Sequence, residues 1–167
     1  MTLFPESSPP PNKPGLDLIL QFDGGSRGNP GPAGIGVTLV TADDETPLYE
    51  LGAFIGQCTN NVAEYTALIR GLEAALALHA TKLLIRADSE LVVRQLNGQY
   101  KVKSPDLKPL YLQAVKLVQQ IGAVKVTHVY REKNSRADAL ANEAMDAQAK
   151  LEPLGPLSAW INARKNK

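Results

Sequence analysis

The sequence has a single cysteine, Cys58, among its 167 residues and no long hydrophobic run. One cysteine excludes an internal disulfide framework and a cysteine-based zinc site. Because no stretch of about 18 apolar residues is present, we expect no transmembrane helix and no membrane partner. The first fifteen residues hold five prolines and are too polar for the apolar core of a signal peptide. These absences predict a cytoplasmic globular protein in which Cys58 is an ordinary packed side chain.

The net charge is also small, at +1, but the charged residues are unevenly distributed along the chain. Residues 1–80 carry three Lys/Arg against nine Asp/Glu, whereas residues 81–136 carry eleven Lys/Arg against four Asp/Glu. Such a distribution is produced either by a basic face that binds nucleic acid or by scattered, solvated charge. Charge alone leaves both interpretations open.

Apolar periodicity predicts three consecutive strands at residues 16–24, 33–44 and 46–56. The pattern then changes to a helix (60–80), a strand (82–88), two helices (89–98 and 104–122), a strand (123–131) and a helix (134–150). Predicted caps are Asn60 or Asn61, the Ser104–Pro105 pair, and Asn134 or Ser135. The fold class is therefore α/β, with a mixed sheet whose first three strands are antiparallel and whose faces are covered by helices.

The composition divides the chain into three parts. Residues 1–15 are predicted to be a disordered, proline-rich arm, and residues 16–149 a single domain. Residues 150–167 are predicted to be a tail, in which Trp160 either docks on the domain or is frayed with the rest.

The segment QFDGGSRGNPGPAGIG, residues 21–36, raises the question of a glycine-rich phosphate cradle. It lacks the GxxxxGK[ST] pattern, and the glycine pair at Gly34 and Gly36 leads into a strand rather than a helix. Pro30 and Pro32 also remove two N–H groups that would bind phosphate. The segment is better explained as an irregular turn that follows Asp23 at the end of a strand.

Four carboxylates are placed where they could meet at one edge of the sheet. Asp23 and Asp88 each end a predicted strand, and parallel neighbouring strands would bring them together. Glu64 and Asp138 lie in the first turns of two predicted helices. Each has an ordinary alternative, since a first-turn acid interacts favourably with the helix dipole, Asp88 can cap a helix, and Asp23 can stabilise a turn.

If these carboxylates converge without Lys or Arg partners, their repulsion must be offset by divalent cations. Oxygen ligands without cysteine favour Mg²⁺, with Mn²⁺ as a possible substitute. Two such ions are suited to in-line hydrolysis of a phosphodiester.

Four segments resemble, in order and spacing, the motifs of ribonuclease H type 1: FDGGSRGNPGPAGIGV, TNNVAEYTALIRGLEAAL, IRADSELVVRQLNG and NSRADALANEA. The resemblance implies a ribonuclease H-like fold with a five-stranded mixed sheet. It implies endonucleolytic hydrolysis of the RNA strand of an RNA–DNA hybrid, leaving 5′-phosphate and 3′-hydroxyl ends. It also implies that two Mg²⁺ ions are bound by four residues, with the first between the ions: Asp23, Glu64, Asp88 and Asp138.

The same resemblance implies substrate contacts. The backbone of Gly24, Gly25 and Ser26 would pass the RNA sugars, whose 2′-hydroxyl groups distinguish RNA from DNA. Contacts to the minor groove or to a phosphate are implied for Asn29, Thr59, Asn60 and Asn61. Helix capping and turn formation remain alternatives for the two asparagines at 60 and 61.

The sequence departs from the longer bacterial members at three places. The loop before Asp138 is short and has no histidine, so Arg131 is the candidate for a phosphate or leaving-group contact, unless it only solvates the strand end. Glu90 stands where a glutamine often contacts the substrate. The tryptophan- and lysine-rich DNA-binding handle is absent, with Lys101, Lys103 and Lys108 as a weaker substitute. These departures indicate the shorter subgroup of archaea and some bacteria.

Two other function classes remain open from the sequence. One is a nucleic-acid-binding module that keeps the fold without the chemistry, and the other is a different nuclease of the same superfamily. Retention of all four carboxylates argues against the first, and the DGGSRGNPGP segment argues against the second. We expect a monomer, with double-stranded RNA as a further substrate to test.

Overall fold

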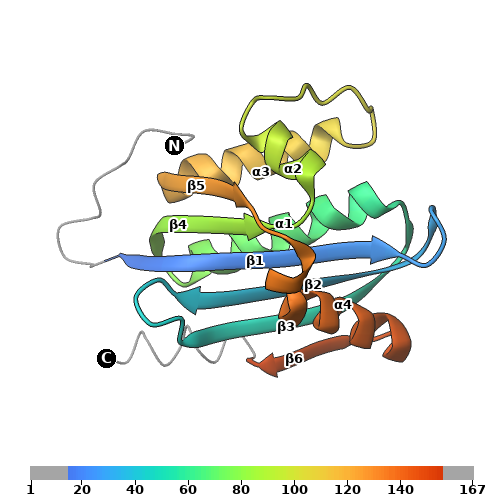
Figure 1. Ribbon diagram of the computed structural model, residues 1–167, viewed down its shortest axis with the longest axis horizontal. Helices are drawn as coiled ribbons and strands as arrows, with labels where there is room; N and C mark the ends of the chain where they lie inside the picture. Colours follow the sequence, from blue (N-terminus) through green and yellow to red (C-terminus); the bar gives the residue numbers. More distant parts are fainter. Residues whose placement is uncertain (1–14, 156–167) are drawn as a thin grey trace.

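A computed structural model describes residues 15–155 and shows one mixed sheet with helices on both faces (Figure 1). The strands are β1 Leu16–Ser26, β2 Gly31–Thr41, β3 Pro47–Cys58, β4 Ala80–Ala87, β5 Ala123–His128 and β6 Lys150–Leu154. The helices are α1 Asn60–Ala77, α2 Glu90–Leu96, α3 Lys108–Ile121 and α4 Ser135–Ala147, with a 3-10 turn, η1, at Arg131–Lys133. Within residues 15–155, no helix is long and apolar enough to cross a bilayer.

The sheet has the order β5-β4-β1-β2-β3-β6. Strands β1, β2 and β3 are antiparallel, as predicted, and β1 and β4 are parallel neighbours. Phe22 of β1 pairs with Ala87, the last residue of β4, so Asp23, still inside β1, lies next to the point where Asp88 follows β4. The condition under which the two carboxylates would meet, parallel pairing of their strands, is therefore met, but the prediction that Asp23 ends its strand was wrong, because β1 continues to Ser26 in its pairing with β2.

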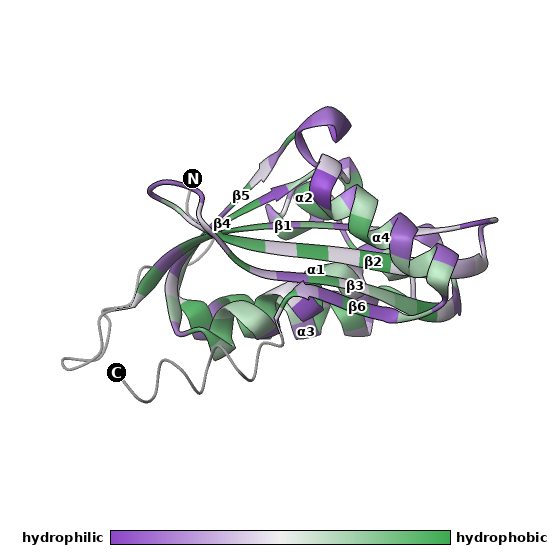
Figure 2. Ribbon diagram, turned by 90° about the horizontal axis from the view of Figure 1, so that it is seen from below, coloured by the Kyte–Doolittle hydropathy of each residue, from purple (hydrophilic) through white to green (hydrophobic). Residues whose placement is uncertain are grey.

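The main core lies between the sheet and the helix pair α1 and α3. Side chains such as Leu20, Phe22, Ile35, Leu68 and Val118 are almost fully buried there. Figure 2 shows hydrophobic residues concentrated in the strands and in α1, with hydrophilic stretches at the connecting turns. Burial of this apolar surface supplies the main stabilisation of the fold, at about 25 cal/mol per Å².

Helix α4 packs against the opposite face, over β2 and β3 (Figure 1). Three glycines make this face flat under the helix. A Cβ atom at Gly36 would collide with the carbonyl oxygen of Ala137, and Cβ atoms at Gly34 and Gly52 would meet the carbonyls of Ala141 and Leu140. Because Gly36 pairs with Asp23, this close approach brings the first turn of α4 beside Asp23.

The predicted count of five strands was one too few. The sixth, β6, lies in the segment predicted to be a tail and pairs antiparallel with β3. Helix α4 ends at Ala147, before a left-handed Gln148, rather than at residue 150 as predicted. Pro153 stands inside β6, where it is tolerated because β6 is an edge strand. The arm at residues 1–14 and the tail from residue 156, with Trp160, lie outside the described residues.

One helix start and one helix cap also differ from prediction. Helix α3 begins at Lys108, and Ser104 instead accepts backbone hydrogen bonds from Leu107 and Lys108 in a preceding turn. This start places Pro109 in the first helical turn, where its missing N–H leaves no bond unmade. Helix α1 is capped by Thr59, whose hydroxyl accepts from the N–H of Val62, and not by an asparagine.

Candidate active site

A cavity of about 400 Å³ opens where β1 and β4 meet the first turns of α1 and α4. Arg27 and Asn142, which the sequence did not single out, also line it. Four of the predicted site residues lie outside its lining: Asn29, Thr59, Lys101 and Lys103. Ten predicted residues are brought together in it: Asp23, Gly24, Gly25, Ser26, Asn60, Asn61, Glu64, Asp88, Arg131 and Asp138.

The alternation of side chains along β1 places Gly24 and Asp23 on opposite faces of the sheet. A Cβ atom at Gly24 would collide with the backbone of Ala63, so Gly24 lies against α1. Successive residues of a strand face opposite sides, and Asp23 therefore faces the side that α4 covers. A Cβ atom at Gly25 would meet only Asn60 Oδ1, at 3.9 Å. Gly24 is thus required by packing, whereas Gly25 leaves open space in the cavity wall.

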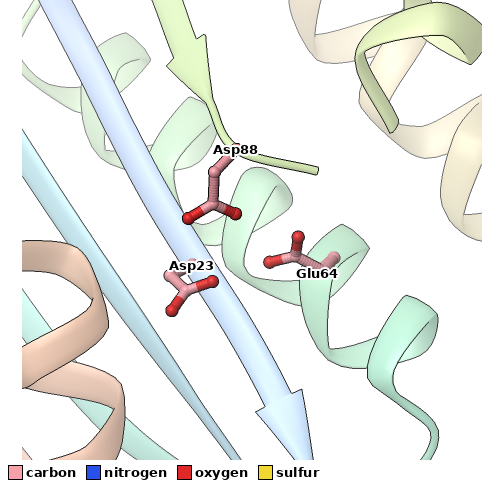
Figure 3. A group of neighbouring side chains, drawn as sticks. All are labelled: Asp23, Glu64 and Asp88. Carbon is pink, nitrogen blue, oxygen red and sulfur yellow. The ribbon is translucent and has the colours of Figure 1, made fainter. Parts of the chain in front are cut away.

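Three of the four carboxylates converge. One oxygen each of Asp23, Glu64 and Asp88 lie within 4.8 Å of one another. Figure 3 shows these carboxyl groups turned toward each other from β1, from α1 and from the end of β4. Glu64 is the most enclosed, with 7% of its surface exposed, and its Oε1 accepts a hydrogen bond of 2.5 Å from the N–H of Gly24.

The fourth carboxylate, Asp138, lines the same cavity but is not part of this group of three. It lies in the first turn of α4, where its N–H donates to the Asn134 carbonyl. It is close enough to Asp23 to interact with that side chain by a hydrogen bond and by charge. The helix places it beside Asp23 through the glycine contact described above.

Burial and the neighbouring negative charges make Asp23 and Glu64 poor anions in the absence of a cation. Burial raises the pKa of Asp23 to about 7, reinforced by the charge of Asp88 and by Asp138 and opposed by a hydrogen bond with Glu64. Burial also raises the pKa of Glu64 well above its usual range, with the charges of Asp23 and Asp88 adding to the effect. Both shifts express the free energy needed to hold negative charge at this site.

No cationic side chain of residues 15–155 forms an ion pair with Asp23, Glu64, Asp88 or Asp138. The ligand atoms are carboxylate oxygens alone, which suit hard divalent cations such as Mg²⁺ and Mn²⁺. The geometry and the donor chemistry therefore fit a divalent-cation site.

Asn134 is a supporting residue whose role the sequence did not indicate. It stands at the predicted cap position of α4, yet its side chain makes no cap hydrogen bond. Instead its Nδ2 donates to the carbonyl of Phe22 (2.8 Å) and to Asp88 Oδ2 (3.1 Å). With only 1% of its surface exposed, Asn134 joins β1, β4 and α4 immediately behind the carboxylates. The sequence gives no sign of these two hydrogen bonds, because an asparagine that only caps a helix would stand at the same position.

The turn after β1 is tied to the start of α1. Asn60 Oδ1 accepts from both the N–H and the hydroxyl of Ser26, at 2.8 and 3.0 Å. Asn29 Oδ1 in turn accepts from the N–H of Asn60, at 3.0 Å. Ser26, Asn60 and Asn61 thus form one wall of the cavity. Asn29 and Thr59 do not line it, and they support this wall through their hydrogen bonds to Asn60 and Val62.

The predicted basic residues are separated from one another. Arg131, in η1, is exposed at the cavity beside Asp88. The η1 turn is fixed to β1, since Gln21 Nε2 donates to the Lys133 carbonyl at 2.7 Å. Lys101 and Lys103 line a different cavity, of about 640 Å³, between α2, the following loop and α3.

Comparison with known proteins identifies the family. The family model described as "Reverse transcriptase-like" matches residues 21–144. A Ribonuclease H of Pseudomonas fluorescens (strain Pf0-1) is 34% identical over 152 residues, covering 78% of this chain and 92% of the relative. The chain belongs to the ribonuclease H family. Membership predicted from the four motifs is thereby confirmed.

Other relatives are more similar to this chain but longer. The "Bifunctional protein Rv2228c" of Mycobacterium tuberculosis (strain H37Rv) is 51% identical over 134 residues, covering 80% of this chain and 37% of the relative. The Ribonuclease HI of Halobacterium salinarum (strain NRC-1) is 48% identical over 125 residues, covering 75% of this chain and 62% of that relative. The chain thus spans little more than a third of the first relative and about three fifths of the second.

Solved structures support the same family fold. The N-terminal RNase H domain of rv2228c from M. tuberculosis superposes with a TM-score of 0.77 at 51% identity, covering 79% of this chain and 95% of that one. LC11-RNase H1, solved in complex with an RNA/DNA hybrid, superposes with a TM-score of 0.74 at 46% identity, covering 79% and 99%. The ribonuclease H-like fold predicted for the chain is confirmed.

The raised pKa of Asp23 predicts how the stability of this protein depends on pH. Folded Asp23 has a pKa of about 7 against an ordinary value of 3.8, so near pH 5 the folded protein holds a proton that the unfolded chain has released. The free energy of unfolding of the metal-free protein therefore falls as pH rises from about 4 to about 7. In EDTA at pH 8, Asp23→Asn should relieve roughly 1.5 kcal/mol of this destabilisation and so raise the Tm by roughly 3–6 °C. One kcal/mol moves the Tm of a domain of this size by about 2–4 °C.

Thermal melts at pH 5 and pH 8, with EDTA or with Mg²⁺, measure this effect. Mg²⁺ should stabilise the wild type at pH 8 and should have little effect on Asp23→Asn. Asp17→Asn is the matched control, because Asp17 is an exposed carboxylate on the same strand. A lower Tm for Asp23→Asn in EDTA at pH 8 would contradict the electrostatic account.

Proposed function

We propose that the chain is an endoribonuclease that hydrolyses the RNA strand of RNA–DNA hybrids and leaves 5′-phosphate and 3′-hydroxyl ends. The observation that carries this proposal is the convergence of Asp23, Glu64 and Asp88 within 4.8 Å, with no cationic partner in the described chain. The hybrid bound by LC11-RNase H1 supports the choice of substrate.

In this proposal Asp23, Glu64, Asp88 and Asp138 hold two Mg²⁺ ions, with Mn²⁺ as a substitute. When bound, the cations supply positive charge that lowers the pKa of the attacking water and stabilises the leaving 3′ oxygen. The N–H of Gly24 holds Glu64 in place, and the side chain of Asn134 holds Asp88. These bonds fix the carboxylates before the substrate arrives, so that little reorganisation is needed during the reaction.

Selection of RNA is assigned to the wall formed by the β1–β2 turn and the start of α1. Gly25 leaves room for close approach of a sugar, and Ser26, Asn60 and Asn61 offer polar groups at the cavity surface. A 2′-hydroxyl group both donates and accepts hydrogen bonds, which is the means of distinguishing RNA from DNA. Asn29 and Thr59 support this wall, and Lys101 and Lys103 are assigned to more distant phosphates.

The chain is further proposed to act as a cytoplasmic monomer. Light scattering on the purified protein tests the monomer directly, and a mass twice that of the chain would contradict it. Double-stranded RNA is kept as a second substrate to assay, because it shares the 2′-hydroxyl groups that the wall would contact.

A cleavage assay with labelled RNA–DNA hybrid, duplex RNA and duplex DNA, each with Mg²⁺ or Mn²⁺, tests the activity. We expect the wild type to cut the RNA strand of the hybrid and to leave duplex DNA intact. Asp23→Asn should lower the hybrid cleavage rate by roughly a factor of 10³ or more, because it removes a charged ligand of the proposed cations. Asp17→Asn should retain the wild-type rate. Hybrid binding without cleavage by the wild type would instead favour a binding module.

Arg131 is proposed to act on the reacting phosphate or leaving group. Arg131→Ala should lower turnover at saturating hybrid by roughly 10- to 100-fold, as expected for loss of one charge-stabilising donor, and change the hybrid Kd by less than about threefold. Lys133→Ala is the matched control, since Lys133 is an exposed cation of the same 3-10 turn that does not line the cavity. Weaker hybrid binding with unchanged turnover would make Arg131 a phosphate anchor only.

A further inference from the structure

Arg27 is a cation at the carboxylate cavity that the proposed chemistry does not use. Among the described residues that line this cavity, Arg27 and Arg131 are the two with positive charge. Arg131 belongs to η1, next to the end of β4, whereas Arg27 follows β1 and faces α4. The two arginines therefore come from different walls of the cavity.

The backbone of Arg27 is held firmly. Its N–H donates to the carbonyl of Pro32 at 2.8 Å, and a Cβ atom at Gly31 would collide with the Arg27 carbonyl. The preceding residue, Ser26, is bound to Asn60 through both its N–H and its hydroxyl. The guanidinium group is thus carried on a fixed backbone, while 48% of the side chain remains exposed.

The present partners of this guanidinium group are weak. Its Nη2 contacts Asp146 Oδ1 at 2.6 Å, but 69% of the Asp146 side chain is exposed. An exposed ion pair of this kind contributes little to stability, because solvent and salt screen it. The second contact, to the carbonyl of Asn142, is long at 3.5 Å. A phosphate group offers a better partner, because it can accept two parallel hydrogen bonds from the planar guanidinium fork.

We propose that Arg27 exchanges Asp146 for a backbone phosphate of the RNA strand, adjacent to the phosphate at the carboxylates, and that Asp146 competes for Arg27. The RNA strand is chosen because Arg27 and Asp23 line one continuous cavity, and Arg27 lies four residues beyond Asp23 on the same chain segment. The strand whose phosphate lies at Asp23 is then the one that reaches Arg27. This inference rests on the proposed function.

The structure supplies a matched control for the loss of charge. Arg136 also joins α4 to the sheet, through a pair of hydrogen bonds of 2.9 Å to Glu50 on β3. Its side chain is 46% exposed, close to the value for Arg27, but it does not line the cavity. Arg27→Gln and Arg136→Gln each remove one positive charge and one ion pair of α4, and only the first removes the proposed phosphate contact.

Hybrid affinity is measured by fluorescence anisotropy at several salt concentrations, in an Asp23→Asn background so that the RNA stays intact. Arg27→Gln should weaken binding roughly fivefold or more and lower the slope of log K against log salt by about 0.7–0.9, the value for one lost phosphate contact. Arg136→Gln should leave both unchanged. Asp146→Asn should raise affinity by up to about twofold, because it frees Arg27 for the phosphate, and an unchanged affinity would overturn the competition by Asp146.

Hybrids with one uncharged methylphosphonate in the RNA strand locate the contact. At a single position next to the cleaved bond, the modification should weaken binding by the protein that retains Arg27 and have no further effect on Arg27→Gln. If the ion pair of Arg27 with Asp146 serves only to stabilise the fold, Arg27→Gln and Asp146→Asn will lower the Tm and the affinity equally and leave the salt slope unchanged. That result would overturn the proposal. Additive losses at every methylphosphonate position would overturn it too.

Failure of this inference is distinguishable from failure of the proposed function. Cleavage of the same unmodified hybrid by the wild type in Mg²⁺ tests the function alone. Wild-type cleavage with an unchanged salt slope for Arg27→Gln rejects only the role of Arg27.

Discussion

One constraint governs the site: the fold must hold together carboxylates that repel one another. Asp23, Glu64 and Asp88 bring oxygens within 4.8 Å of one another. Burial, together with the charge of Asp88 and with Asp138, raises the pKa of Asp23 to about 7. A fold can keep such a group only if other contacts supply the free energy that the site lacks. Here that free energy comes from the core beneath β1 and from the helices that hold each carboxylate. The site is consequently prepared for cations before any cation is bound.

Two close helix–sheet contacts carry out this positioning. Gly24 lets α1 approach β1 until its N–H reaches Glu64, and Gly36 lets α4 approach until Asp138 stands beside Asp23. Asn134 then links the carbonyl of Phe22 to Asp88. Side chains on three different elements are therefore fixed relative to β1, and the central strand acts as the common reference. A side chain added at either glycine would displace a carboxylate that is distant in sequence.

Most of this arrangement follows from the sequence, and the failures have physical causes. Alternating apolar residues and the four motifs singled out Asp23, Glu64, Asp88 and Asp138, whereas the parallel pairing of β1 with β4 was only a condition of their meeting, which the structure meets. The sixth strand was missed because a short edge strand containing Pro153 carries little strand signal. The supporting role of Asn134 and the packing role of Gly36 depend on contacts between distant segments, which spacing along one chain does not reveal. Arg27 escaped notice for the same reason, since it lines the cavity together with residues of α1 and α4 that are distant in sequence.

The central claim is that the three carboxylates form a divalent-cation site. Anomalous diffraction from crystals soaked in Mn²⁺ tests it most directly, because the scattering locates the cation without reference to activity. The account predicts an anomalous peak coordinated by oxygens of Asp23, Glu64 and Asp88, and no peak at this place in crystals of Asp23→Asn. A structure at saturating Mn²⁺ with no peak between these carboxylates, or with the manganese bound elsewhere on the domain alone, would contradict it.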